Sequence, residues 1–255
     1  MGSEIELEFM HLVADEASEL AMHFFATGAK VDVKADQSLV TEADLAVEQL
    51  IRARITERFP GDAIVGEEFG SIGSAARTWI VDPIDGTSYF AKADPNWRIH
   101  LALQVREQIQ LAVVAAPALA LRWWAERGQG CFEADWPAGR YSPRRLSASQ
   151  RPDLQGSLVA CAPEASRLRI PPECGIASPT PLPLVELVRG EIDAFVAEGF
   201  YIWDHAPWIL LVQEAGGSFT DREGSTSGDR GGGVYSNELL HADLVNALGY
   251  PALFR

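Results

Sequence analysis

The sequence predicts an α+β fold, because its helix and strand patterns are grouped along the chain. Two helical patterns stand before the first strand pattern, and a run of short strand patterns follows them. The chain has 255 residues, of which 47% are hydrophobic, and this is enough to bury a sizeable core. A disordered chain is therefore excluded.

The N-terminal segment is predicted to form a long amphipathic helix, since apolar residues recur at helical spacing from Ile5 to Phe25. The polar stretch 30–39 is predicted to be a loop. A second helix is expected to begin at Thr41, whose hydroxyl can cap it, and to end before Pro60. Two helices thus precede the first strand.

The next part of the chain is predicted to be rich in short strands. Residues 63–66 and 78–81 have strand patterns, and residues 99–105 and 109–115 are expected to pair as a hairpin across a polar turn.

A composition change marks an expected boundary between two lobes. Residues 134–183 are rich in Pro, Arg and Ser and contain one strand pattern, at 157–161, so the boundary is placed near residue 145. Beyond it, the patterns predict a helix at 184–189, a strand at 192–197 and a helix at 203–215. The predicted units are an N-terminal α+β lobe, residues 1–145, and a C-terminal α/β lobe, residues 146–255.

The composition argues against several classes of partner. A net charge of −15 disfavours nucleic acid or an anionic membrane, because both attract clustered Lys and Arg. The three cysteines are widely spaced, which indicates neither a disulfide framework nor a zinc site. The N-terminus lacks the basic region of a signal peptide, and no apolar run reaches membrane-spanning length. We therefore expect a cytoplasmic protein.

The most informative stretch is an apolar strand pattern that runs into two carboxylates, Asp82 and Asp85. Two acids at close range repel each other unless a cation lies between them, and oxygen ligands of this kind gather Mg²⁺. Gly86, Thr87 and Ser88 then favour a short helix start whose backbone N–H groups can face a phosphate. A turn with solvated acids is the alternative.

Two weaker signals accompany this stretch. Glu67 and Glu68 follow a predicted strand, and Asp204 stands at the start of a predicted helix. Surface Glu pairs are common and an Asp at a helix start is ordinarily a cap, so neither signal is specific by itself.

In combination, these stretches resemble the inositol monophosphatase family. The family is marked by G-E-E, W-I-[VI]-D-P-I-D-G-T, W-D and E-A-G-G, which stand here at residues 66–68, 79–87, 203–204 and 214–217. Residues 116–130 look closest to the bacterial histidinol-phosphate phosphatase branch. The resemblance implies a five-layered α-β-α-β-α sandwich, as in fructose-1,6-bisphosphatase.

The resemblance also implies two to three Mg²⁺ ions in one site. The implied ligands are the carboxylates and one carbonyl that these motifs supply: Glu67, Asp82, the Ile84 carbonyl, Asp85 and Asp204. Glu67 and Thr87 would act on the attacking water, with Asp44 hydrogen-bonded to Thr87. The substrate contacts implied are Gly86, Thr87, Ser88, Asp204, Glu198 and Lys34.

Three of these assignments have an ordinary alternative. Asp44 stands where a capping box with Thr41 would place an acid, so its role at the site and its role as a cap are both open. Lys34 can equally be a solvated loop charge. Glu198, predicted to bind substrate hydroxyls, can be a solvated residue at a strand end.

The sequence departs from the family pattern in several places. Tyr89 replaces the usual Asn, residues 94–98 replace a more apolar run, and Pro207 interrupts the small residues after W-D, where we expect it in the first helical turn. The segment 167–183 is short and rich in proline where relatives carry substrate contacts.

The leading hypothesis is Mg²⁺-dependent hydrolysis of a small phosphate monoester, inositol monophosphate or histidinol phosphate, by metal-activated water. Alternatives are a fructose-1,6-bisphosphatase or a 3′-phosphonucleotide phosphatase of the same fold, and a catalytically silent protein that binds a phosphorylated ligand. Relatives are commonly homodimers, so a homodimer is expected.

Overall fold

The structure is a computed structural model that describes residues 3–137, 142–228 and 231–251. Residues 1–126 and 132–144 form one compact unit, and residues 127–131 and 145–255 form a second. Across the described ranges, no helix combines the length and apolar character that a membrane crossing requires.

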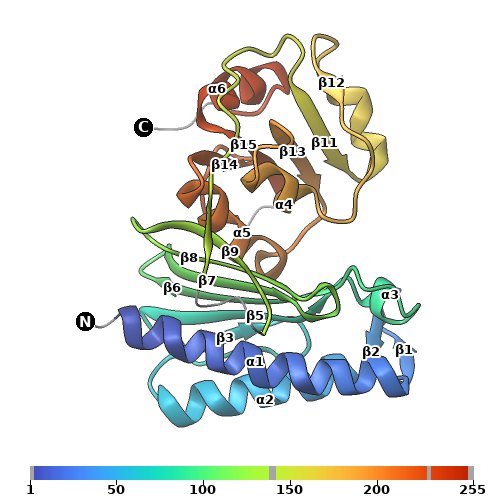
Figure 1. The fold of residues 1–255 in the computed structure, drawn as a ribbon, viewed down its shortest axis with the longest axis vertical. Helices are drawn as coiled ribbons and strands as arrows, with labels where there is room; N and C mark the ends of the chain where they lie inside the picture. Colours follow the sequence, from blue (N-terminus) through green and yellow to red (C-terminus); the bar gives the residue numbers. More distant parts are fainter. Residues whose placement is uncertain (1–2, 138–141, 229–230, 252–255) are drawn as a thin grey trace. The chain divides into compact units, whose positions relative to one another are not determined.

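Two helices of the first unit pack side by side on one face of its sheet (Figure 1). The predicted N-terminal helix is confirmed as α1, Ser3–Thr27, and the predicted second helix as α2, Glu42–Arg58. The Thr41 hydroxyl accepts hydrogen bonds from the N–H groups of Ala43 and Asp44, so the predicted cap is also present.

The loop predicted for residues 30–39 is wrong in part. The structure has two short strands there, β1 (Val31–Val33) and β2 (Leu39–Thr41), which pair antiparallel. Strands of three residues leave no periodic pattern in the sequence, and β1 is exposed, so its residues do not have to alternate.

The first unit is built on a sheet of order β10-β9-β8-β7-β6-β5-β3-β4. β3 and β5 run parallel, whereas β6 and β7 continue the sheet antiparallel. The bounds are β3 Ala63–Gly66, β4 Gly70–Ile72, β5 Arg77–Asp85, β6 Arg98–Val105, β7 Gln108–Ala116, β8 Leu121–Glu126, β9 Gly130–Asp135 and β10 Arg144–Leu146. The predicted hairpin is confirmed as β6 and β7, and the short helix η1 (Pro117–Leu119) follows it.

The core of this unit lies between the helices and the sheet. Met10 of α1 and Ile51 of α2 are fully buried together with Trp79 of β5 and Leu101 of β6. Burial of side chains of this size contributes about 1.5–3 kcal/mol each. The apolar residues of β5 therefore anchor this strand in the core, and they fix the position of the carboxylates at its end.

Strand β5 is longer than predicted, because it continues past the apolar run 78–81 to Asp85. Asp82 stands opposite His100 and Asp85 opposite Arg98 on β6, with an irregularity in register between the two pairs. Pairing with β6 thus extends the strand through both acids. The hydrophobic pattern of β5 alone does not reveal this pairing. The short helix α3 (Thr87–Phe90) follows at the predicted place.

The second unit contains a five-stranded sheet of order β12-β11-β13-β15-β14. β11 and β13 are parallel, and β15 pairs antiparallel with both β13 and β14. The bounds are β11 Leu158–Ala162, β12 Gly175–Ile176, β13 Ala194–Glu198, β14 Gly217–Asp221 and β15 Gly232–Asn237. The helices are η3 Glu164–Arg169, α4 Pro183–Val188, α5 Ile202–Glu214 and α6 Glu238–Ala247.

Helices α5 and α6 cover opposite faces of this sheet. Val196 and Val234 pack with α6, whereas the alternate residue Tyr235 contacts His205 of α5. Pro207 lies inside α5 as its sixth residue, so the expectation that it falls in the first turn is wrong. The helix continues through it to Glu214, although an interior proline removes one N–H donor and crowds the carbonyl of the preceding turn.

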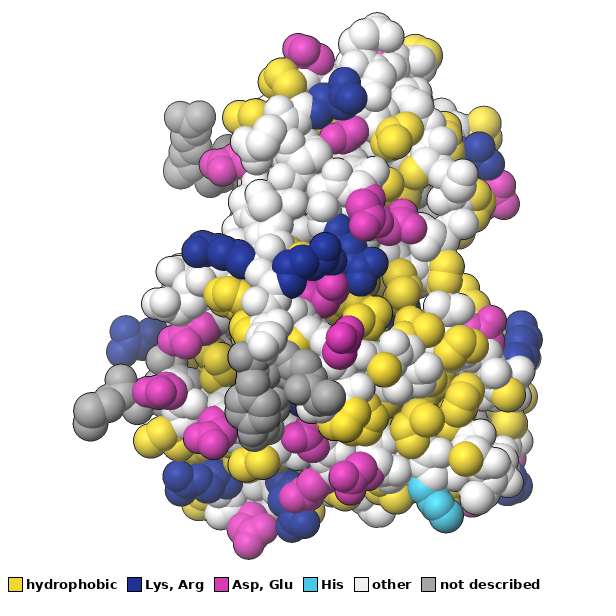
Figure 2. Space-filling view, viewed as in Figure 1, with side chains coloured by type: hydrophobic (Ala, Val, Ile, Leu, Met, Phe, Trp, Pro, Cys, Tyr) yellow, Lys and Arg dark blue, Asp and Glu magenta, His cyan; other side chains and the backbone are white. Residues whose placement is uncertain are grey.

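The acidic composition does not make the surface uniformly negative. Lys and Arg side chains are interspersed with Asp and Glu on the face drawn in Figure 2.

Candidate active site

Two carboxylates at the end of β5 lie close together. Asp82 is 1% exposed, and its Oδ1 accepts a hydrogen bond from Ile84 N at 3.0 Å. Asp82 and Asp85 each offer an oxygen within 4.8 Å of the other. Charges at this separation in a buried place repel strongly, so this end of the strand requires a cation.

Glu67, at the end of the parallel neighbour β3, is held by Lys34. The Lys34 ammonium donates to Glu67 Oε1 at 2.8 Å and to Glu68 Oε1 at 2.7 Å. Burial raises the pKa of Glu67, and it raises that of Glu68 to about 7, although Lys34 opposes both shifts. Lys34 is thus bound to the acid pair, and the alternative of a solvated loop charge is wrong.

The turn that carries Glu67 is fixed by Glu48, a residue that sequence reasoning missed. Glu48 is fully buried and accepts hydrogen bonds from the N–H groups of Glu68 and Phe69 at 2.7 and 3.2 Å. A Cβ at Gly66 would lie 2.1 Å from Glu48 Oε1, which explains the glycine of this motif. The available signal was the spacing of Asp44, Glu48 and Arg52 in steps of four along one helix face.

Asp44 contacts Thr87 as expected from the family resemblance, and it also closes the predicted capping box. Thr87 Oγ1 lies 3.1 Å from Asp44 Oδ1, while Asp44 Oδ2 accepts from Thr41 N at 2.8 Å. Thr87 Oγ1 lies 3.1 Å from the Ile84 carbonyl as well. Burial raises the pKa of Asp44 despite these hydrogen bonds. The predicted capping box is therefore confirmed and the contact with Thr87 is present beside it, while a role of Asp44 in catalysis stays a prediction.

Gly86 makes the tight link between β5 and α3. Its φ of 86° lies in the left-handed region, and a Cβ there would meet the Asn96 carbonyl at 3.2 Å. Thr87 and Ser88 are the first two residues of α3, and Tyr89 follows them in the same turn. Gly86 thereby turns the chain so that Thr87 faces back toward Ile84 and Asp44.

Arg98 and His100 of β6 face Asp85, and the sequence had marked this region only as a departure from the family pattern. Arg98 Nε donates to Asp85 Oδ2 at 2.6 Å, and Arg98 Nη2 contacts the same oxygen. His100 Nε2 lies 3.4 Å from it. Burial acts to raise the pKa of Asp85, but the charges of Arg98 and His100 outweigh it and leave that pKa below its ordinary value.

In the second unit, Asp204 is the third residue of α5. Its Oδ2 accepts a hydrogen bond from Tyr201 N at 2.6 Å, so one oxygen of this predicted metal ligand caps the helix. The adjacent His205 is buried and its Nδ1 lies 2.5 Å from Tyr235 Oη. His205 therefore belongs to the core beside Phe219 rather than to the carboxylate group.

Glu198 ends strand β13 and is bound by two arginines. Its Oε1 lies 2.5 Å from Arg169 Nη1 and 2.7 Å from Arg222 Nη2. Burial acts to raise the pKa of Glu198, but the contacts with Arg222 and Arg169 outweigh it and leave that pKa below its ordinary value. The alternative of a merely solvated carboxylate is thus wrong, although this contact does not itself define a substrate role.

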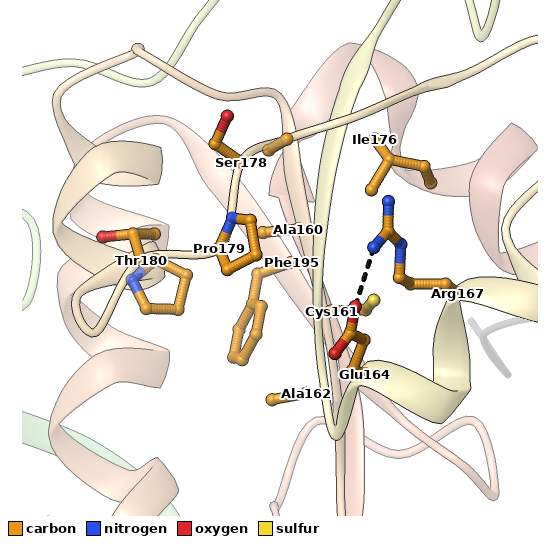
Figure 3. Close-up of a pocket in the computed structure, with 12 residues that line it drawn as sticks. Ala160, Cys161, Ala162, Glu164, Arg167, Ile176, Ser178, Pro179, Thr180 and Phe195 are labelled. Carbon is orange, nitrogen blue, oxygen red and sulfur yellow. Dashed lines mark hydrogen bonds and ion pairs between the residues drawn. The ribbon is translucent and has the colours of Figure 1, made fainter.

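Beside β11, the second unit has a pocket lined by small and apolar side chains (Figure 3). Glu164 and Arg167 point toward each other at its rim, joined at 2.8 Å, with Cys161 beside them. The other side is formed by Ser178, Pro179 and Thr180 of the proline-rich segment.

The residues of the first unit suit a divalent cation with oxygen ligands. Glu67, Asp82 and Asp85 are carboxylates at the ends of two adjacent strands, and Ile84 offers a carbonyl between the last two. Hard cations such as Mg²⁺ take this donor set, whereas zinc prefers Cys and His. The donor chemistry therefore fits the implied metal.

Comparison with known proteins places the chain in a family. It matches the profile of the inositol monophosphatase family over residues 4–249. A Streptomyces griseus protein named glucose-1-phosphate thymidylyltransferase is 36% identical over 258 residues, covering 96% of this chain and 97% of that protein. The histidinol-phosphatase of Mycobacterium tuberculosis is 34% identical over 253 residues, covering 92% and 95%.

A solved structure supports the same assignment. The extragenic suppressor protein SuhB from Bartonella henselae superposes with a TM-score of 0.80 at 27% identity, covering 96% of this chain and 98% of that one. The α+β fold is therefore that of this family, as the motifs at residues 66–68 and 79–87 indicated. The chain belongs to the inositol monophosphatase family.

Proposed function

We propose that this protein is a Mg²⁺-dependent phosphatase that hydrolyses inositol monophosphate or histidinol phosphate. Family membership supports a phosphoric monoester hydrolase. The observation that carries the proposal is the group of Glu67, Asp82 and Asp85 with the Ile84 carbonyl, buried or half-buried at the ends of β3 and β5. Carboxylates held this close together, away from water, destabilise the fold unless a cation offsets their charge.

In this proposal, Glu67, Asp82, Asp85 and the Ile84 carbonyl hold the metals, and Asp204 adds a ligand from the second unit. Bound Mg²⁺ supplies an activated water and neutralises charge on the phosphate ester. The protein holds the ligand carboxylates in one orientation. The Ile84 N–H on Asp82 Oδ1 and the Tyr201 N–H on Asp204 Oδ2 serve this purpose by orienting each carboxylate.

Thr87 and Glu67 are proposed to orient and deprotonate the attacking water, with Asp44 holding the Thr87 hydroxyl. Backbone N–H groups of Gly86, Thr87 and Ser88 are proposed to bind the phosphate.

Lys34 stabilises the Glu67–Glu68 pair and is also a proposed phosphate contact. Glu198 is proposed to bind the alcohol part of the substrate. A cytoplasmic homodimer completes the proposal, and the free cysteines Cys131, Cys161 and Cys174 agree with a reducing compartment.

The test is release of inorganic phosphate with Mg²⁺, with Ca²⁺ and after removal of metal by a chelator. The substrates are inositol 1-phosphate, histidinol phosphate, fructose 1,6-bisphosphate and 3′-phosphoadenosine 5′-phosphate. We expect Mg²⁺-dependent turnover of one of the first two and little with Ca²⁺, whose longer bonds suit a compact site poorly. Binding without turnover of all four esters would instead favour the silent phospho-ligand protein.

The Streptomyces griseus relative is named for thymidylyl transfer to glucose 1-phosphate. One further reaction distinguishes that activity from the proposed phosphatase activity. The protein is incubated with glucose 1-phosphate, with and without dTTP. Our proposal predicts no pyrophosphate release, and any phosphate released from glucose 1-phosphate should not depend on dTTP. Pyrophosphate release that requires dTTP would contradict the proposal.

A further inference from the structure

The pairing of β5 with β6 brings two basic side chains to one of the proposed metal ligands. In this antiparallel register, Asp85 stands opposite Arg98 and Asp82 opposite His100. Residues two apart on a strand point to the same face, so Arg98 and His100 approach the acids together. Both end within reach of a single atom, Asp85 Oδ2.

The Arg98–Asp85 ion pair differs from an ordinary surface salt bridge. The Arg98 side chain is 12% exposed and the Asp85 side chain 17%, so water screens the pair only in part. Two nitrogens of the guanidinium contact the same carboxylate oxygen. Charge-assisted contacts of this kind are about twice as strong as neutral hydrogen bonds.

The surroundings hold Arg98 in this place. Its neighbours Trp97 and Ile99 are fully buried, and Trp97 packs against Phe90 of α3 with ring centroids 4.9 Å apart. The backbone of Arg98 is therefore fixed, and its guanidinium can move only by rotation of its own side chain. A metal ion that takes Asp85 Oδ2 as a ligand must then displace this guanidinium.

We propose that Arg98 is a tethered cation that competes with a metal ion for the Asp85 carboxylate. The inference rests on the proposed function, because it takes Asp85 as a metal ligand. Arg98 neutralises Asp85 when the metal is absent, and this stabilises the folded, metal-free protein. Binding of the metal then exchanges one cation for another, so the affinity for Mg²⁺ is lower than the carboxylates alone would give.

The experiment measures Mg²⁺ binding by titration calorimetry and the melting temperature of the metal-free protein. In Arg98→Met, which keeps the apolar stem and removes the charge, Mg²⁺ should bind about tenfold more tightly, because no charged hydrogen bond has to be broken. The metal-free melting temperature should fall, because Asp85 and Asp82 lose their counter-charge. Arg98→Gln carries the same expectations if the Met variant does not fold.

Two further variants supply controls. Arg77 lies at the other end of β5 and pairs with Asp62 and Glu6, so Arg77→Met should lower the melting temperature but leave the Kd for Mg²⁺ unchanged. Arg98→Lys keeps the charge but loses the contact by two nitrogens, so its Kd for Mg²⁺ should lie between those of the wild type and Arg98→Met. Equal tightening in Arg98→Lys and Arg98→Met would overturn the proposal, since charge would not be the cause.

Asp85→Asn separates this proposal from the proposed function. If Asp85→Asn binds Mg²⁺ as tightly as the wild type, Asp85 is no metal ligand and the metal assignment itself is wrong. If Asp85→Asn weakens binding while Arg98→Met leaves the Kd unchanged or raises it, the competition by Arg98 is refuted and the metal assignment stands.

Discussion

Asp44 joins the second helix to the candidate active site through its two carboxylate oxygens. Oδ2 accepts from Thr41 N and closes the capping box of α2, while Oδ1 lies 3.1 Å from the hydroxyl of Thr87. The side chain is fully buried, so neither contact is easily replaced by water. Helix capping and placement of Thr87 are therefore linked in one residue.

This linkage predicts different outcomes for two substitutions at one helix end. Thr41→Ala removes the hydroxyl cap and should lower the free energy of unfolding by about 0.5–2 kcal/mol. It leaves the contact from Asp44 to Thr87, so kcat should stay near the wild-type value. Asp44→Asn should lower kcat by about 10²-fold, because the anionic acceptor that orients Thr87 is lost.

Phosphate release and denaturant unfolding are measured for both variants, at a temperature where both are fully folded. If Thr41→Ala lowers kcat as much as Asp44→Asn does, Asp44 acts only through the helix cap.

Asp82→Asn should abolish phosphate release while the protein stays folded. Asp82 is buried and its Oδ1 accepts from Ile84 N, a hydrogen bond that the Asn oxygen can retain. The lost negative charge weakens metal binding, and it also relieves repulsion from Asp85 in the metal-free state. We therefore expect a higher melting temperature without metal and a smaller rise when Mg²⁺ is added. Turnover at the wild-type rate would show that Asp82 does not bind the metal.

The motif residues could be predicted from the sequence because they are contiguous. Asp82 and Asp85 directly follow an apolar run, and Thr41 precedes a helical pattern, so local rules suffice for both. The contact of Asp44 with Thr87 spans 43 positions and was expected only from the family resemblance. Local periodicity carries no information about such a pair.

Other contacts depended on strand register, which the sequence does not determine by itself. Arg98 and Asp85 are paired by the irregular register between β5 and β6, and the same pairing extends β5 past its apolar run. Glu48 was missed because the role of a buried acid on a helix becomes clear only when the groups that donate hydrogen bonds to it are known. Its carboxylate accepts hydrogen bonds from the backbone N–H groups of Glu68 and Phe69, which lie in a turn far away in the sequence.

His241 should make stability depend on pH in the second unit. It is buried between two hydroxyls: its Nδ1 lies 2.7 Å from Ser236 Oγ and its Nε2 lies 2.7 Å from Thr220 Oγ1. Ser236 donates its own proton to the Asn237 carbonyl, so Nδ1–H donates to Ser236 and Nε2 accepts from Thr220. Burial lowers the pKa of His241 from 6.5 to about 4.

The unfolded chain therefore binds a proton at a higher pH than the folded protein does. The contribution of neutral His241 is fully present above pH 6.5 and is lost as the pH falls toward 4, by about 3 kcal/mol in all. His241→Gln, which cannot be protonated, should show a shallower fall in the free energy of unfolding over this window. The measurement is urea unfolding at several pH values, and parallel curves for both proteins would exclude His241 as the source.

Glu198 should affect selectivity for the alcohol part of the substrate. Arg169 and Arg222 both contact its Oε1, which fixes the carboxylate at the end of β13. Glu198→Gln keeps the shape and removes the charge, so esters that carry a hydroxyl or ammonium group should lose about 1.5–3 kcal/mol of transition-state binding, or roughly ten- to hundredfold in kcat/KM. An ester without such groups, p-nitrophenyl phosphate, should lose much less.

The matched control for this prediction is Glu164→Gln, which breaks the more exposed ion pair with Arg167 in the same unit. Exposed pairs contribute about 0–1 kcal/mol, so this variant should leave all three rates near the wild type. kcat/KM is measured on inositol 1-phosphate, histidinol phosphate and p-nitrophenyl phosphate at one Mg²⁺ concentration. If Glu198→Gln lowers all three values equally, Glu198 supports the metals or the fold, because a contact to the alcohol part cannot act on an ester that lacks it.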